Sequence, residues 1–278
     1  MVDGLQNKKV AFIIQARMKS SRLPGKVLLP LPIDSDKTIL ELLTNKLNEV
    51  DFNADIIIAT STNIENNELE EFSIKHKIKC FRGSENDVLS RFISICENNN
   101  YDVVVRLTAD NPIIDIKILQ DVIQQHIKSK NDYTHTQGLP IGMNLEIINP
   151  KALISLKDHK LTPADKEHVT MFMRKSKSYK KGLINTFEKN EYQNIRTTVD
   201  YPSDYLVVSA IISIAEKNGL PLGLDLISFI IKNYDWLFNV NETNYQKRKY
   251  GSLKEEITNA IPILENLEFN RIVNELKR

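Results

Sequence analysis

Apolar runs alternate with amphipathic stretches along the first half of the chain. The apolar runs lie at residues 10–14, 55–60, 79–82 and 101–107. The amphipathic stretches, with apolar residues three or four positions apart, lie at residues 39–47, 64–76, 84–96 and 115–127. A short apolar run predicts a strand covered on both faces, and the wider spacing predicts a helix. Four strand–loop–helix units in succession predict an α/β fold with a mostly parallel central sheet flanked by helices.

The pattern changes in the second half of the chain. Short strands are predicted at residues 133–136, 145–148, 184–187 and 195–199. Capping residues mark helix starts at Ser84, with Asp87 three residues on, and at Thr162, whose helix runs to about residue 175. Residues 224–278 predict two or three further helices. We expect an α/β domain at 1–220 and a helical C-terminal extension at 221–278, either packed on that domain or forming a homodimer contact.

Composition narrows the classes of partner. The 278 residues include 37 basic and 36 acidic side chains, a net charge of +1, so no global field favours nucleic acid or a membrane surface. Two cysteines, Cys80 and Cys96, have no metal-ligand spacing and are expected to be free thiols. The longest apolar stretch is too short to span a bilayer, and the N-terminus lacks a signal-peptide core. These features predict a cytoplasmic protein.

The loop after the first strand is the most informative segment. It carries four cations, at Arg17, Lys19, Arg22 and Lys26, with two serines, a proline and a glycine among them. Ligands of open α/β sheets bind at the carboxyl ends of strands, and clustered cations beside hydroxyl groups suit a polyphosphate. On these residues alone, a solvated basic turn is an equally good interpretation.

Two aspartates favour the phosphate interpretation. Asp110 and Asp200 each follow a predicted strand, and either one alone is commonly a turn or cap residue. Two carboxylates together with a cationic loop fit a Mg²⁺–nucleotide site, since Mg²⁺ takes oxygen ligands and bridges phosphates. No P-loop or dinucleotide-binding glycine motif occurs, so phosphate binding would depend on side chains.

The sequence IQARMKSSRLPGK at residues 14–26 resembles the opening signature of the cytidylyltransferase family, which includes the CMP-KDO and CMP-acylneuraminate synthetases. The spore-coat polysaccharide biosynthesis protein F group is the most similar branch. Further segments resemble its pattern in the same order, at residues 81–91, 105–112, 139–142 with Glu146, 167–170 and 198–204. Gln15 stands where the KDO and neuraminate enzymes have proline, which argues against assuming either of their sugars.

The resemblance implies a nucleotide-diphospho-sugar transferase (glycosyltransferase-A-like) fold and an activity. CMP would pass from CTP to a sugar acid or related acceptor, with Mg²⁺ as cofactor and release of pyrophosphate, in surface polysaccharide biosynthesis. The implied catalytic residues are Arg17, Lys26 and Asp110, and the implied metal ligands are Asp110 and Asp200. The implied nucleotide-binding residues are Ala16, Arg17, Ser21, Arg22, Lys26, Gly83, Ser84, Arg91 and Arg106. The implied acceptor-binding residues are Tyr133, Glu146, Glu167 and His168, with His135 as a further candidate.

Two alternatives remain open at this point. A glycosyltransferase using a nucleotide-sugar donor could share the fold, although such enzymes usually carry an Asp-x-Asp motif where this chain has Thr108-Ala109-Asp110. A catalytically silent nucleotide-binding subunit is the other, and the intact set of Arg17, Lys26 and the two aspartates disfavours it.

Overall fold

The computed structural model describes residues 5–186, 192, 194–244 and 252–277. The chain divides into two compact units, at residues 1–243 and 244–278. The first unit therefore continues past residue 220. The functions assigned to the two parts of the chain, and the packing or dimer role of the extension, stay predictions.

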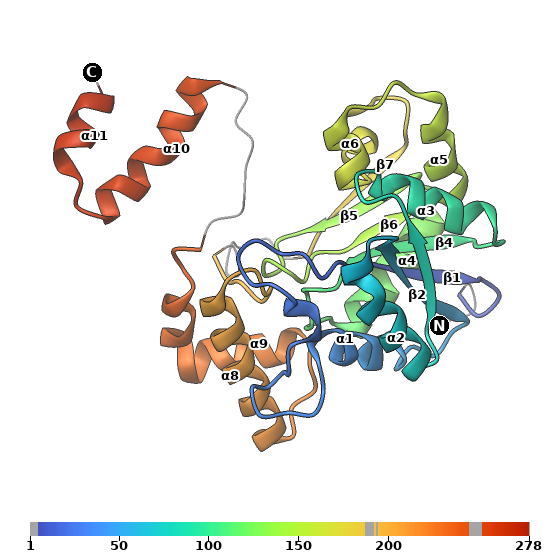
Figure 1. Ribbon diagram of the computed structural model, residues 1–278, viewed down its shortest axis with the longest axis horizontal. Coiled ribbons are helices and arrows are strands. Elements are labelled where there is room, and N and C mark those ends of the chain that lie inside the picture. Colours follow the sequence, from blue (N-terminus) through green and yellow to red (C-terminus); the bar gives the residue numbers. More distant parts are fainter. Residues whose placement is uncertain (1–4, 187–191, 193, 245–251, 278) are drawn as a thin grey trace. The chain divides into compact units, whose positions relative to one another are not determined.

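The first unit is built on a seven-stranded sheet, confirming the predicted α/β class (Figure 1). Its strands lie in the order β3-β2-β1-β4-β6-β5-β7. Their bounds are β1 Val10–Gln15, β2 Ala54–Ser61, β3 Lys79–Gly83, β4 Val103–Thr108, β5 Tyr133–Gln137, β6 Glu146–Ile148 and β7 Lys181–Asn185. The four strands β3, β2, β1 and β4 are all parallel to one another, and β7 is parallel to β5. Only β6 runs against both of its neighbours in this sheet, so the sheet is mostly parallel.

Helices cover both faces of the sheet because successive strand residues point to opposite sides. In β1, Phe12 and Ile14 face one core, and Ala11 and Ile13 face the other. The first core is closed by α1 Ile39–Leu47, α2 Asn67–Lys75 and α4 Ile116–Ser129. The second is closed by α3 Val88–Glu97, α5 Pro150–Ile154 and α7 Met171–Lys175, and α6 Pro163–His168 packs on α3. Figure 1 shows α3, α5 and α6 on the opposite side of the sheet from α1, α2 and α4.

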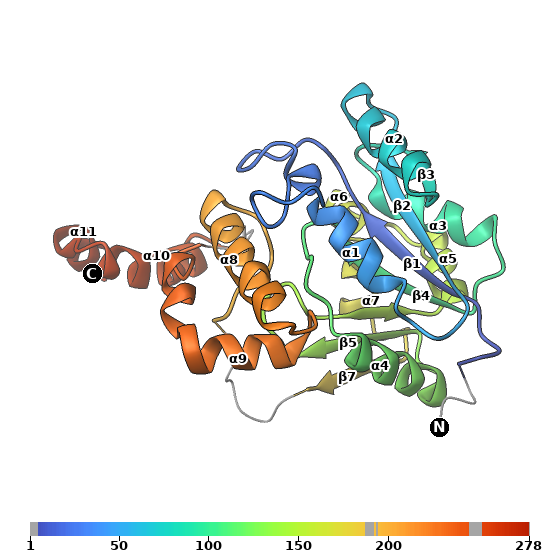
Figure 2. The ribbon, with the colours of Figure 1, turned by 90° about the horizontal axis from the view of Figure 1, so that it is seen from below.

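A third core lies beside the loop that follows β1. It is formed mainly by α8 Pro202–Asn218 and α9 Leu224–Tyr234, and Figure 2 shows α8 next to that loop. The hydroxyl of Tyr205 donates to the carbonyl oxygen of Pro30 at 2.5 Å, and the Ile33 amide donates to Ser209 Oγ at 3.0 Å. These contacts fix the start of α8 against the first loop. Short 3-10 helices complete the unit at Lys26–Leu28, Ile64–Asn66, Ser155–Asp158 and Asp235–Val240.

The structure corrects three details of the predicted elements. The helix expected from Ser84 begins at Val88, because Asp87 is the residue that caps it, accepting from the Ser90 amide. The strand expected at 195–199 forms only an isolated bridge, between Arg196 and Ile141. The strand expected at 184–187 is β7, which ends at Asn185; residue 187 lies outside the described residues.

The second unit contains α10 Leu253–Asn266 and α11 Asn270–Leu276 in its described part. Ser252 caps α10 by accepting from the Glu255 amide at 3.2 Å. Across both units, no helix in the described ranges is long and apolar enough to cross a bilayer.

Candidate functional site

Lys26 forms an ion pair with each of the two candidate aspartates, Asp110 and Asp200. Its Nζ lies 2.6 Å from Asp110 Oδ2 and 2.8 Å from Asp200 Oδ1. The lysine side chain is 9% exposed, and the two aspartate side chains are 22% and 21% exposed. A lysine this buried is stable because both of its partners are oppositely charged and within hydrogen-bond distance.

The fold brings these three residues together from distant parts of the sequence. Strands β1 and β4 are adjacent and parallel, so the loop carrying Lys26 and the loop carrying Asp110 emerge at the same edge. Gly25, at φ 67°, provides the left-handed turn from which Lys26 begins its short helix. The Val199 amide donates to the Asp110 carbonyl at 2.9 Å and so brings Asp200 alongside. Asp200 therefore reaches the site without a sheet strand before it.

Each aspartate is also fixed by a second contact. Thr108 Oγ1 donates to Asp110 Oδ1 at 2.7 Å. The backbone amide of Asp200 donates to Asp204 Oδ2 at 3.1 Å at the start of α8. Asp204 is fully buried and pairs with Arg196, so this anchor is itself immobilised. The surrounding chain thus holds the carboxylate of Asp110 and the backbone of Asp200.

The remaining cations of the first loop take different positions. Arg22 lies 3.4 Å from Asp200 and stacks over the Tyr201 ring at 4.4 Å. Arg17 and Ser21 are exposed, whereas Ala16 is buried and donates its amide to the Ala59 carbonyl at 3.3 Å. The structure therefore places Arg22 with Lys26 at the carboxylates and leaves Arg17 at the surface.

Arg91 supports the loop that follows β3. Its guanidinium donates to the carbonyl oxygens of Ser84 at 2.7 Å, Glu85 at 3.1 Å and Ala59 at 3.4 Å. Arg91 is 2% exposed, and burial lowers its pKa. Gly83 lies against it, since a Cβ there would be 3.1 Å from the arginine Cγ. Arg91 therefore holds the backbone of the loop that contains Gly83 and Ser84, and its described contacts are structural.

A second charged cluster surrounds Glu146 on β6. Arg106, its register partner on β4, forms an ion pair with it and also donates to Gln15 Oε1 at 3.1 Å. On the other side, Arg174 Nη2 lies 2.5 Å from Glu146 Oε1. The hydroxyls of Tyr133 and Thr170 also donate to this carboxylate. Arg106, which the sequence places with the nucleotide, therefore lies with the predicted acceptor residues.

Burial and the neighbouring charges shift the pKa values of Glu146, Tyr133 and His135. Burial acts to raise the pKa of Glu146, but Arg106 and then Arg174 outweigh it and bring the pKa to about 2. Burial and the nearby Glu146 raise the pKa of Tyr133. Burial, followed by Arg174, lowers the pKa of His135, which stacks on Tyr133 with ring centroids 5.4 Å apart. Two guanidinium groups around one carboxylate leave this cluster with a net positive charge near neutral pH.

A strained turn at Val169 positions two members of the cluster, Thr170 and Arg174. Val169 has φ 56° and ψ −57°, and the Thr170 amide donates back to the His168 carbonyl at 2.5 Å. This is the rare γ-turn with positive φ, which is unfavourable for a β-branched residue. It separates α6 from α7, where the sequence predicts one continuous helix. The turn directs Thr170 and Arg174 to Glu146 and leaves Glu167 and His168 exposed.

Sequence reasoning missed Thr170 and Arg174. Thr170 is the last residue of the motif at 167–170, and its place in that motif was the signal that could have identified it. Arg174 lies among ordinary helical cations and carries no such signal.

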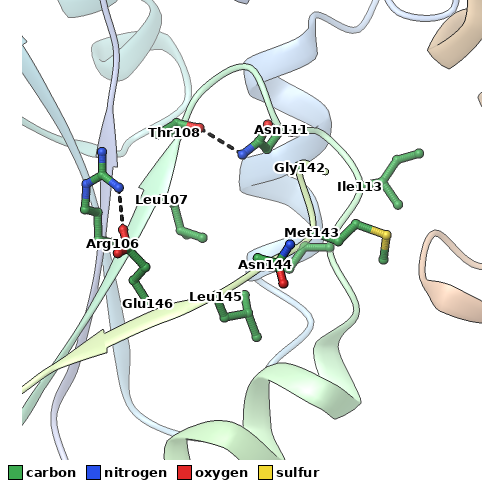
Figure 3. Close-up of a pocket in the computed structure, with 11 residues that line it drawn as sticks. Arg106, Leu107, Thr108, Asn111, Ile113, Gly142, Met143, Asn144, Leu145 and Glu146 are labelled. Carbon is green, nitrogen blue, oxygen red and sulfur yellow. Dashed lines mark hydrogen bonds and ion pairs between the residues drawn. The ribbon is translucent and has the colours of Figure 1, made fainter. Parts of the chain in front are cut away.

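A small cavity lies beside the Arg106–Glu146 pair, and Thr108, which donates to Asp110, also lines it (Figure 3). Its volume is about 60 Å³, and it opens where β4 and β6 diverge beyond the Arg106–Glu146 pair. Asn111 and Asn144 contribute amide groups to its wall, and Met143 contributes apolar surface. Asn111 Oδ1 and Arg106 Nε are buried and have no hydrogen-bond partner among the residues that the structure describes. A cavity of this size and polarity accommodates one small polar group.

The carboxylate pair fits a divalent cation. A cationic group already lies between Asp110 and Asp200, in hydrogen-bonding contact with an oxygen of each. No group of three or more His, Cys, Asp or Glu side chains suited to a metal occurs in the described ranges. Two carboxylates are nonetheless enough for Mg²⁺ when phosphates and water supply the other ligands.

Comparison with known proteins agrees with the fold and the first motif. A family model for cytidylyltransferases matches residues 11–231. The spore coat polysaccharide biosynthesis protein SpsF of Bacillus subtilis is 34% identical over 232 residues, which are 81% of this chain and 95% of that protein.

Solved structures extend the comparison to three dimensions. A cytidylyltransferase from Leptospira borgpetersenii has a TM-score of 0.75 at 28% identity, covering 87% of this chain and 100% of that one. A CMP-2-keto-3-deoxy-manno-octonic acid synthetase in complex with CTP has a TM-score of 0.52 at 14% identity, covering 74% and 99%, which shows the fold alone. These likenesses confirm the nucleotide-diphospho-sugar transferase fold. Since the family model spans most of its length, the chain belongs to the cytidylyltransferase family and is a nucleotidyltransferase.

Proposed function

We propose that this protein is a Mg²⁺-dependent enzyme that transfers CMP from CTP to a sugar acid or related anionic acceptor in surface polysaccharide biosynthesis. The observation that carries the proposal is the contact of Lys26 with both Asp110 and Asp200, beside a polar cavity at one edge of the sheet. The description of the Bacillus subtilis relative supports the biosynthetic setting.

The reaction is an in-line displacement at phosphorus. An oxygen of the acceptor attacks the α-phosphorus of CTP, the bond from that phosphorus to the bridging oxygen breaks, and pyrophosphate leaves. Catalysis of this kind depends mainly on positioning and on neutralising charge. Bound Mg²⁺, held by Asp110 and Asp200, supplies charge stabilisation at the phosphate oxygens.

The first loop and the loop after β3 form the nucleotide half of the site in this proposal. Lys26, Arg22 and the exposed Arg17 neutralise the triphosphate, and the Ser21 hydroxyl and the Ala16 backbone lie on the same loop. Gly83 and Ser84, whose loop Arg91 supports, approach the nucleoside.

The Glu146 cluster forms the acceptor half. Arg174 donates from Nε to the Tyr133 hydroxyl oxygen at 2.7 Å and from Nη2 to Glu146. Its Nη1 has no partner among the described residues. Its side chain is half exposed, so Nη1 is available to an anionic group of the acceptor. Glu146 and Tyr133 orient this arginine. Glu167 and His168, on the exposed end of α6, are proposed to contact the part of the acceptor that lies outside the cavity.

Pyrophosphate release tests the proposal. The purified chain is incubated with CTP and Mg²⁺, alone and with a panel of sugar acids, sugar phosphates and neutral sugars. We expect release that depends on CTP and on one class of anionic acceptor. Asp110→Asn should abolish turnover while leaving the fold intact, whereas Asp121→Asn, an exposed aspartate on α4, should not. Absence of release with every acceptor, or normal turnover in Asp110→Asn, would contradict the proposal.

A further inference from the structure

We propose that Lys26 is the resident counter-cation of the aspartate pair, and that it excludes a divalent metal from Asp110 and Asp200 until a nucleotide draws it away. Metal and nucleotide would then bind together and not independently. This inference rests on the proposed function, because it takes the two aspartates to be metal ligands.

The contacts show how completely the lysine occupies the pair. It donates to one oxygen of each carboxylate, at 2.6 Å and 2.8 Å, and thereby uses two of the three N–H bonds of its ammonium group. The second oxygen of Asp110 accepts from Thr108, and the second oxygen of Asp200 lies 3.9 Å from Arg196. The lysine therefore occupies Asp110 Oδ2 and Asp200 Oδ1, and Arg22 Nη2 lies 3.4 Å from the latter.

Charge explains why the lysine remains there. Two carboxylates held together by the fold repel one another unless a cation lies between them, and their fixed backbone contacts prevent them from separating. A dication placed on the same oxygens would repel the ammonium group at contact distance. A metal binding without nucleotide must therefore first break both lysine hydrogen bonds in a largely buried position.

A triphosphate offers the lysine another anion. Lys26 lies on the same loop as Arg17 and Arg22, so phosphate oxygens bound by that loop are within the reach of its flexible side chain. Its third N–H has no partner among the described residues and is free to make the first contact. Transfer of the ammonium to phosphate releases the carboxylate oxygens for the metal. By linkage, each ligand then raises the affinity for the other.

Direct binding of Mn²⁺ without nucleotide tests the exclusion. We compare the wild-type chain with Lys26→Met, whose side chain is unbranched and nearly as long but carries no charge. Lys19→Met is the matched control, because Lys19 is an exposed cation of the same loop. Electron paramagnetic resonance of free Mn²⁺ should show at least about tenfold tighter binding to Lys26→Met than to wild type, and no change for Lys19→Met. Adding Asp110→Asn to Lys26→Met should return binding to the weak level.

The fold of each variant is followed by circular dichroism, and Lys26→Gln provides a second neutral variant that retains donors. Equal Mn²⁺ affinity in wild type and in both neutral variants would overturn the exclusion. Water-proton relaxation of the Mn²⁺–CTP complex with wild type distinguishes that result from a failure of the proposed function. If the complex binds and Asp110→Asn weakens it, only the exclusion has failed. If no variant binds Mn²⁺ with or without CTP, the metal assignment has failed as well.

Discussion

Arg106 and Glu146 are register partners on antiparallel strands, and their ion pair closes one end of the polar cavity. Arg106 is also hydrogen-bonded to Gln15, so a residue at the end of β1 is linked to the proposed acceptor half. A proline at this position, which the sequence resemblance assigns to the KDO and neuraminate enzymes, has no side-chain oxygen to accept a hydrogen bond from Arg106.

Stability should depend on the charge of Glu146 in acid. Its pKa in the folded protein is about 2, below the ordinary value of 4.5, so its contribution is complete above about pH 4.5 and is lost as the pH falls toward 2. Glu146→Gln should lower the free energy of unfolding by roughly 3 kcal/mol at pH 7, and the difference from wild type should shrink below pH 4.5. Urea unfolding across this range measures both. Glu71→Gln, at an exposed position of α2, should show no such convergence.

His126 should act in a separate pH window. It is buried on α4, with Nδ1 2.8 Å from Thr134 Oγ1, and burial lowers its pKa to about 4. The folded protein therefore favours the neutral ring, and this contribution is lost as the pH falls from about 6.5 toward 4. His126→Gln should flatten the wild-type decrease in unfolding free energy between those values. An unchanged slope would show that the ring takes up its proton without cost in the folded state.

Arg174 should determine acceptor affinity. With the anionic acceptor that supports turnover, Arg174→Gln should raise its KM by about tenfold or more, since a charge-assisted hydrogen bond is lost. The KM for CTP should stay within about twofold because Arg174 contacts none of the nucleotide-side residues. Lys175→Gln, the neighbouring exposed cation, is the control. A change confined to the KM for CTP would move Arg174 to the other half of the site.

Substitution of Arg91 should lower the stability of the fold directly and lower CTP affinity only as a consequence. Arg91→Lys cannot reach the three carbonyl oxygens in the same geometry, and it should lower the free energy of unfolding by about 2 kcal/mol or more. Arg82→Lys is the comparison, because its partners lie nearer the surface and the cost should be smaller. CTP affinity should fall with Arg91→Lys because the 83–87 loop loosens. Full stability with lost CTP affinity would make Arg91 a direct ligand.

Gly142 should resist substitution more strongly than another glycine of positive φ. Its φ is 108°, and a Cβ there would lie 2.7 Å from the Thr198 amide nitrogen, on the segment that leads to Asp200. A Cβ at Gly219, which has φ 64° after α8, would meet nothing within 4 Å. Gly142→Ala should therefore lower both the melting temperature and CTP turnover, and Gly219→Ala should cost only about 1 kcal/mol of stability. Equal effects would show that the backbone at Thr198 moves freely.

The sequence predicted the parts of this fold whose signal is local. Apolar runs located β1, β2 and β4, because a strand covered on both faces must be apolar along its length. The cationic loop was also identifiable from composition and spacing. The contacts of Lys26 with Asp110 and Asp200 were not identifiable, since 84 and 174 positions separate these partners. The pairing of β1 with β4 brings Asp110 to the lysine, and the Val199–Asp110 backbone hydrogen bond brings Asp200.

Other features had misleading local signals. Val169 is β-branched and would normally be placed in a helix or strand, so its positive φ could not be expected. The γ-turn exists because the surrounding contacts, including those of Thr170 and Arg174 to Glu146, determine the backbone there. Residues 195–199 had the composition of a strand, but they lie beside the 139–141 loop and form only one bridge.

The two halves of the proposed site are largely separated along the sequence. Apart from Asp200, the nucleotide half is encoded by residues 16–110, and the acceptor half by residues 133–174 together with Arg106. A mutation in the later segment can alter the acceptor without changing the residues that activate CTP. Selection can therefore act on substrate choice while the inherited phosphate chemistry is preserved.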